Sequence, residues 1–182
     1  AEAIRANDPS GLITMISNDP DGFYSRPGLA YYLSGEIPQK QLYIFTKNDW
    51  RCLAAKLIHG KATRLVPGEH RLILNHSDVV SYDRLLLAAG AASIKLDIPG
   101  GNLRGVVYLD SLEDTNHIIQ KSRKTKSIVV VGGGILALEL VEGLRSRRRN
   151  VHYLMRGSHY WPNVLDETES RIVEENLLHD GV

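Results

Sequence analysis

The feature that most constrains this chain is the run of β-branched residues Ile128–Val131, which is followed at once by three glycines. Such a run favours a strand in a parallel sheet. Apolar residues at helical spacing then extend from Ile135 to Arg147, and a second strand is predicted over Val151–Met155. The order of strand, glycine loop, helix and strand predicts an α/β fold with a Rossmann-like nucleotide-binding domain.

The glycine loop has the spacing Gly132-x-Gly134-x-x-Ala137. In a dinucleotide fingerprint, the first glycine makes a tight turn and the second lets the backbone approach a pyrophosphate. The third position needs only a small residue, so that the helix can pack on the strand. Free N–H groups at the helix start, at Ile135 and Leu136, would then face the phosphates. The alternative is a glycine turn with a purely structural role.

The end of the second strand bears on cofactor choice. An acidic residue that binds the adenosine ribose is expected about 20 residues after the glycine loop, but Met155 and then Arg156 stand there. A guanidinium suits a 2′-phosphate, so the sequence favours NADP over NAD. In the alternative, Arg156 points to solvent and pairs with Asp166 or Glu167.

Composition narrows the class of protein. The 182 residues are 43% hydrophobic and 24% charged, with a net charge of +1, which is typical of a soluble globular chain and favours neither a nucleic-acid nor a membrane partner. Cys52 is the only cysteine, so we expect no disulfide within the chain, no metal site and a reducing, cytoplasmic location. No apolar run reaches the length of a transmembrane helix.

The remaining elements are predicted from local pattern. The sequence indicates a helix at the start of the chain, a strand at Leu12–Ile16, a hairpin around Pro67-Gly68, a buried strand at Leu85–Ala89, a capped helix within Ser111–Lys126 and an amphipathic helix over Asp166–His179.

Five stretches in family order resemble the FAD-dependent pyridine nucleotide–disulfide oxidoreductases, in the branch of ferredoxin, rubredoxin and nitrite reductase-type flavoproteins. They are ITMISNDPDGFYSRPGL, SYDRLLLAAGA, DIPGGNLRGVVYLDSLED, VVVGGGILALELVEGL and LMRGSHYWPNVLDETES. The resemblance implies flavin-binding roles for Ser17 or Asp19, Arg26, Pro27, Ala62, Ala89 and Gly90. It also implies that Glu139 lies near the contact between flavin and nicotinamide, as an orienting residue.

The resemblance further implies a partial FAD-binding domain at residues 1–110 and a partial NAD(P)-binding domain at 111–182. The FAD glycine loop of the family would precede Ala1, so we expect the chain to be part of a longer flavoprotein. The expected activity is hydride transfer from NAD(P)H to FAD, with electrons passed on to an unidentified acceptor that is ferredoxin-, rubredoxin- or nitrite reductase-like. The alternative is a truncated, non-catalytic dinucleotide-binding module.

The paired Cys-x4-Cys of disulfide reductases is absent from the sequence, which argues against direct disulfide chemistry. Residues 121–156 hold nine Lys or Arg and two Glu. This basic stretch could steer an acidic electron-acceptor protein or the phosphates of NADPH, and the alternative is an ordinary solvated surface.

Overall fold

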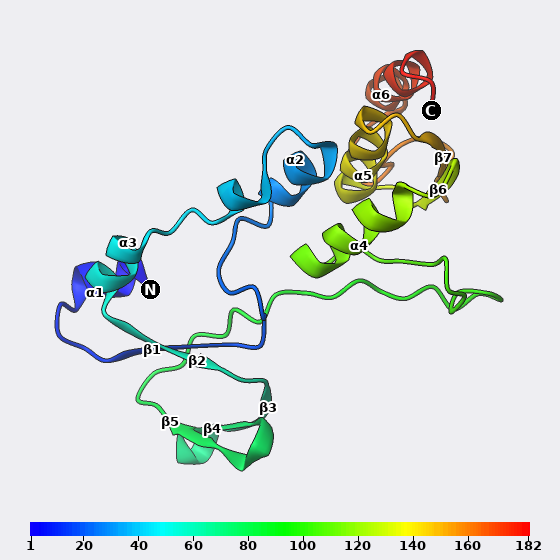
Figure 1. Ribbon diagram of the computed structural model, residues 1–182. Helices are drawn as coiled ribbons and strands as arrows, with labels where there is room; N and C mark the ends of the chain where they lie inside the picture. The colour runs from blue at the N-terminus through cyan, green and yellow to red at the C-terminus, as the bar shows by residue number, and fades with distance from the viewer. The chain divides into compact units, whose positions relative to one another are not determined.

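The computed structural model describes residues 1–182, apart from the side chain of His76. The chain forms two compact units, shown in Figure 1: Ala1–Tyr24 with Tyr43–Ala91, and Ser25–Leu42 with Ala92–Val182. Residues 25–42 therefore belong with the second unit although they interrupt the first in sequence. The expected boundary after residue 110 concerns cofactor binding and stays a prediction.

The first unit contains two small sheets. Strands β1 and β2 pair in parallel, with Ile13 opposite Ala55 and Ser17 opposite His59. Strands β3, β4 and β5 form an antiparallel sheet in that order. The elements are α1 (Glu2–Asn7), β1 (Ile13–Ser17), α3 (Lys47–Leu53), β2 (Ala55–His59), β3 (Ala62–Val66), η2 (Pro67–Glu69), β4 (Arg71–Leu74), η3 (Asn75–Ser77) and β5 (Val79–Ser81).

Local chemistry explains the turns of this unit. Pro67 opens a short 3₁₀ turn, and His70 adopts a left-handed conformation with φ +52°, so that β4 runs back along β3. The predicted hairpin is therefore confirmed. Helix α3 begins with a capping box in which Thr46 accepts from the Asp49 N–H and the Asp49 carboxylate accepts from the Thr46 N–H.

The prediction of a buried strand at Leu85–Ala89 is wrong. These residues are in neither helix nor strand, and Leu86 and Leu87 are 75% and 68% exposed. A strand exists only when its N–H and C=O groups pair with a neighbour. None of the strands in the described sheets pairs with this segment, although its composition suits the interior of a sheet.

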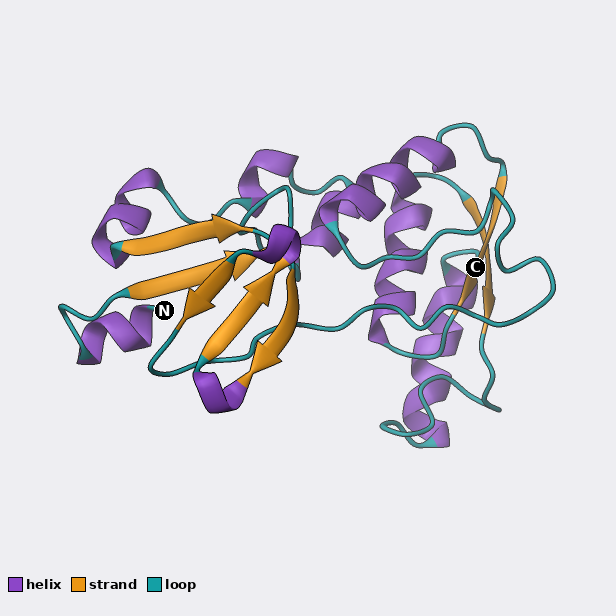
Figure 2. Ribbon diagram, turned by 90° about the horizontal axis from the view of Figure 1, so that it is seen from below, coloured by secondary structure: helices purple, strands orange, loops and turns teal.

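The second unit has the predicted α/β arrangement. Strands β6 and β7 pair in parallel, from Ser127 opposite Asn150 to Val131 opposite Leu154. Helix α5 connects them, and the unit's helices and strand pair are distinguished by colour in Figure 2. The elements are α2 (Gly28–Ser34), η1 (Gln39–Leu42), α4 (Leu112–Ser122), β6 (Ser127–Val131), α5 (Ile135–Ser146), β7 (Asn150–Leu154) and α6 (Glu167–His179).

One core joins the four α-helices and both strands of this unit. Side chains from the four helices meet one from each strand, and every one of them is at most 7% exposed. Val130 is buried, whereas Val129 and Val131 are more than half exposed, so the helices cover one face of β6. The core residues are Leu33, Ile118, Ile119, Val130, Val141, Leu144, Val151 and Leu177.

Helix α2 is held against α5 by a close approach and by a charged cap. A Cβ on Gly143 would lie 3.0 Å from Leu33 Cγ, so the glycine permits the contact between the helices. The Arg147 guanidinium, at the end of α5, donates from Nε to the Leu33 carbonyl and from Nη2 to the Tyr32 carbonyl. Arg147 thereby satisfies the Leu33 carbonyl and adds a second donor to the Tyr32 carbonyl, which also accepts from the Gly35 N–H at 3.2 Å.

We predict that Arg147→Met lowers the free energy of unfolding by about 1.5 kcal/mol, because charged hydrogen bonds to the α2 carbonyls are lost. Urea denaturation of the protein would measure the loss. Arg148→Met is the matched control, since Arg148 is exposed and adjacent. Equal losses in the two variants would contradict the anchoring role of Arg147.

Candidate dinucleotide-binding site

The first and third positions of the fingerprint, Gly132 and Ala137, lie in close contact. A Cβ built on Gly132 would lie 2.8 Å from the Ala137 Cβ, closer than carbon atoms can approach. The Gly132 N–H donates to the Leu154 carbonyl at 3.0 Å, which extends the pairing of the two strands by one bond. Glycine at 132 and a small residue at 137 are therefore both needed for α5 to start this close to β6.

The second position is different, because its lack of a side chain is not explained by packing. A Cβ on Gly134 would meet a single atom within 4 Å, Trp161 Nε1 at 3.9 Å, and a Cβ on Gly133 would meet none. The space in front of Gly134 is thus open to a ligand. The fingerprint predicts that a dinucleotide pyrophosphate occupies this opening, and its placement stays a prediction.

The start of α5 is available to an anion. Gly134 is its N-cap residue and supplies no side-chain acceptor, whereas α4 and α6 begin with the capping boxes of Ser111 and Asp166. The uncapped helix presents the N–H groups of Ile135 and Leu136 and the positive end of its dipole. Oxygen atoms of a pyrophosphate supply the acceptors that such a terminus lacks.

Arg156 follows β7 and is exposed, while Met155 is partly buried. Asp166 is already engaged, since one carboxylate oxygen accepts from the N–H groups of Thr168 and Glu169, each at 2.8 Å. Among the side chains that the structure describes, no ion pair joins Arg156 to Asp166 or Glu167. The guanidinium is therefore not held by the acidic start of α6.

A cluster of acids and phenols lies beside α5. Burial, reinforced by Asp180, Glu139 and Glu36, raises the pKa of Glu142. Burial also raises the pKa of Tyr160, with a further contribution from Glu142 and Glu139. Glu139 is thus close to ionisable neighbours on the predicted nucleotide-binding helix, and its expected role toward a flavin stays a prediction.

The Tyr153 side chain is the most strongly perturbed member of this cluster. Burial, and then the neighbouring Tyr160, raise the pKa of Tyr153 to about 12. The two rings lie 6.5 Å apart between centroids. Neither hydroxyl has a hydrogen-bond partner within the described part of the chain, and both oxygens are buried. Both phenols are therefore held in the neutral form.

The loop between β7 and α6 contributes a residue that sequence reasoning missed. Trp161 adopts a left-handed conformation with φ +50°, which is rare for a bulky side chain. Its indole nitrogen is the single atom near the open position at Gly134. The one sequence signal was an aromatic pair, Tyr160-Trp161, just before Pro162.

The residues predicted to bind flavin fall in both units. Ser17 ends β1, and its hydroxyl accepts from the Asp19 N–H at 3.1 Å. Arg26 donates to the Asp110 carbonyl. Their proposed flavin contacts remain predictions. The first unit holds Ser17, Asp19, Ala62, Ala89 and Gly90, and the second holds Arg26 and Pro27.

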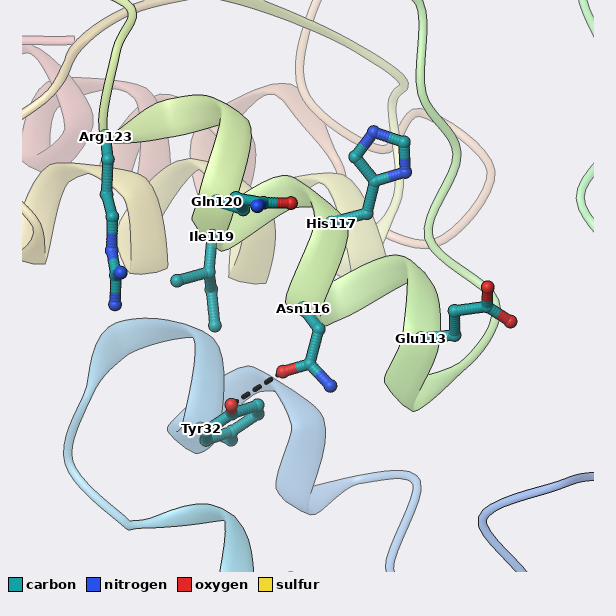
Figure 3. Close-up of a pocket in the computed structure, with 7 residues that line it drawn as sticks. All are labelled: Tyr32, Glu113, Asn116, His117, Ile119, Gln120 and Arg123. Carbon is teal, nitrogen blue, oxygen red and sulfur yellow. Dashed lines mark hydrogen bonds between the residues drawn. The ribbon is translucent and has the colours of Figure 1, made fainter.

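A separate groove of about 520 Å³ lies in the second unit between α2 and α4. Figure 3 shows the Tyr32 hydroxyl donating to Asn116 Oδ1 across it, at 2.7 Å. Glu113 and Arg123 lie toward its ends. No residue of the glycine loop lines this groove, so it is not the predicted nucleotide site.

The described residues form neither a metal-binding cluster nor a membrane-spanning helix. Their side chains include no group of three His, Cys, Asp or Glu arranged to hold a metal ion. None of the helices has both the length and the apolar character needed to cross a membrane. Cys52 is free and exposed.

A parallel strand pair joined by a helix that starts on Gly132-x-Gly134-x-x-Ala137 defines a Rossmann-like nucleotide-binding protein of the α/β class. The sequence matches the profile of the pyridine nucleotide-disulphide oxidoreductases over residues 1–182, and the chain belongs to this family. Its members use FAD together with NAD(P)H.

Individual relatives are similar over nearly the whole chain. A nitrite reductase [NAD(P)H] of Bacillus subtilis is 28% identical and aligns with 93% of this chain and 21% of its own length. The ferredoxin–NAD(+) reductase component of the biphenyl dioxygenase system of Paraburkholderia xenovorans is 30% identical, over 100% of this chain and 45% of its own. The chain spans less than half the length of these curated relatives.

Solved structures have the same fold. The ferredoxin reductase of Rhodopseudomonas palustris superposes with a TM-score of 0.92 at 24% identity, over 100% of this chain and 45% of its own. The NAD-dependent persulfide reductase of A. fulgidus gives 0.89 at 28% identity, over 98% of this chain and 36% of its own. The expected α/β fold is thus confirmed.

We predict that Gly134→Val abolishes dinucleotide binding and leaves thermal stability nearly unchanged, because its side chain enters the open space and not the core. Gly132→Val should lower both dinucleotide binding and thermal stability, since its side chain would collide with Ala137. Calorimetric titration with NADH and NADPH, together with melting curves, would separate the two. A folded Gly134→Val protein with unchanged affinity would refute the placement of the pyrophosphate.

The raised pKa of Tyr153 predicts a loss of stability in alkali. The unfolded phenol ionises near pH 10, but the folded one holds its proton until about pH 12, so the free energy of unfolding falls between these values. The loss is on the order of 1 kcal/mol, because the side chain is partly exposed. Tyr153→Phe should flatten this decline in urea denaturation, and Tyr43→Phe, at an exposed tyrosine, should not.

Proposed function

We propose that this chain is part of an FAD-dependent NAD(P)H oxidoreductase that passes hydride from NAD(P)H to flavin and electrons on to a separate acceptor. In this proposal, residues 1–110 contribute to the FAD site and residues 111–182 bind the nicotinamide dinucleotide. The observation that carries the proposal is the uncapped start of α5 behind an open Gly134. Family membership and the named relatives support the redox chemistry.

The chain's own residues would bind and orient the dinucleotide. The N–H groups of Ile135 and Leu136 would hold its pyrophosphate, and Ala137 would let α5 approach closely enough for them to do so. Glu139, one turn farther along α5, would orient the reacting rings without forming a covalent bond. The bound flavin would supply the hydride-accepting chemistry.

The acceptor is expected to be a protein, as it is for the ferredoxin and rubredoxin reductases among the relatives. The basic stretch at residues 121–156 would favour an acidic partner. The lack of a Cys-x4-Cys pair in this chain agrees with electron transfer from flavin rather than through a thiol pair.

The experiment is anaerobic reduction of the purified full-length protein. Addition of NADH or NADPH should bleach the absorbance of bound flavin, and an artificial one-electron acceptor should restore it. A protein that binds the dinucleotide but carries no flavin would be a non-catalytic binding module. That result would overturn the proposal.

We predict that Arg156 and Met155 set the choice of cofactor. Arg156→Ala should weaken NADPH binding about tenfold to a hundredfold, because a charged contact to phosphate contributes roughly 1.5–3 kcal/mol. NADH binding should change little. Met155→Glu should reverse the preference, since a carboxylate repels the 2′-phosphate and accepts from a ribose hydroxyl.

Dissociation constants at low salt, measured for both cofactors, would check this prediction. Arg171→Ala is a suitable control, because Arg171 is also an exposed arginine of the second unit but lies on α6. An unmodified protein that prefers NADH, or an Arg156→Ala variant that weakens both cofactors equally, would show that Arg156 does not read the phosphate.

A further inference from the structure

The indole nitrogen of Trp161 borders the open space in front of Gly134. The position of a Cβ on Gly134 is 3.9 Å from Trp161 Nε1, and no other atom outside the glycine's chain neighbours lies within 4 Å of it. An oxygen atom in this space that lies about 1 Å nearer the indole than this position would be within hydrogen-bonding distance of Nε1.

The indole N–H is chemically suited to an anionic oxygen. The indole nitrogen can only donate a hydrogen bond, so its partner must be an acceptor such as a phosphate oxygen. The N–H groups at the start of α5, which lies close to the indole, are donors too. Donors that converge from a helix start and a side chain fit a group with several oxygens, such as a pyrophosphate.

The neighbouring residues fix the position of Trp161. The Trp161 carbonyl accepts from the N–H groups of Val164 and Leu165, at 2.9 and 3.0 Å. Tyr160, which is 1% exposed, packs its ring against the indole with centroids 6.1 Å apart. These contacts hold a bulky residue in a left-handed conformation that it would not choose by itself.

Helix α6 secures the same segment from the other side. The Ser170 hydroxyl donates to the Tyr160 carbonyl at 2.6 Å, and the Tyr160 N–H donates to Glu174 Oε1 at 2.7 Å. Ser170 is fully buried. The indole is therefore placed before any ligand arrives, which reduces the entropy lost on binding.

We propose that Trp161 is a dinucleotide-binding residue, whose indole N–H donates a hydrogen bond to the pyrophosphate held by the glycine loop. This inference rests on the proposed function and extends it to the loop between β7 and α6. Helix α6, through Tyr160, positions the tryptophan and does not touch the ligand.

The test uses Trp161→Phe in the full-length protein, which keeps an aromatic ring but lacks the indole N–H donor. NADH affinity should fall about tenfold by calorimetry, the loss expected for one hydrogen bond to a charged group. The affinity for ADP-ribose, which contains the pyrophosphate, should fall by the same factor. Adenosine monophosphate, which lacks it, should bind the variant and the unmodified protein equally.

Trp50→Phe is the matched control, because Trp50 belongs to the first unit and packs against Phe23 and Phe45. It should leave the affinity for ADP-ribose unchanged. A measurement on the unmodified protein needs no stable variant: with the indole nitrogens isotopically labelled, the Trp161 N–H resonance should shift when ADP-ribose is added, but not with adenosine monophosphate.

The outcomes separate the two proposals. If the unmodified protein binds neither NADH nor NADPH, the proposed function fails. If it binds them but the Trp161 resonance does not move and Trp161→Phe retains full affinity for ADP-ribose, the role of Trp161 is refuted while the proposed function stands. If Trp161→Phe also lowers the affinity for adenosine monophosphate, Trp161 has a structural role and the inference is refuted.

Discussion

The second unit depends on the close contact between Gly132 and Ala137. It sets how near the start of α5 lies to the end of β6, where a single added carbon would give a separation of 2.8 Å. The remainder of α5 then brings Val141 and Leu144 into the core with Val130. Its far end anchors α2 through Arg147. One steric constraint thus governs both the opening at Gly134 and the packing of the helices behind it.

Strong local patterns made much of the second unit predictable. The capped helix after Ser111 and the helix after Asp166 each begin with a capping box in the structure. Four β-branched residues followed by glycines led to β6 and the start of α5. In each case the residues that determine the element lie within a few positions of one another, so the element can be predicted from local sequence.

The errors and omissions have non-local causes. Leu85–Ala89 has strand composition, but a strand requires a partner whose presence no local pattern can report. The position of Trp161 beside Gly134 results from hydrogen bonds to Val164 and Leu165 and from the packing of Tyr160. Nothing about a tryptophan before a proline predicts a left-handed backbone. The flavin-contact residues came from resemblance alone, and local pattern offers no check on them.

The missing side-chain cap on α5 has a consequence for protein engineering. Serine, aspartate or asparagine at a helix N-cap typically stabilises a protein by about 1 kcal/mol relative to alanine, and by roughly 0.3 kcal/mol relative to the glycine found here. The side chain of such a residue at 134 would accept from the same N–H groups that the proposed pyrophosphate contact uses. Directed evolution for heat resistance alone would therefore favour, by this small margin, a side chain at position 134 that blocks the proposed contact with the nucleotide.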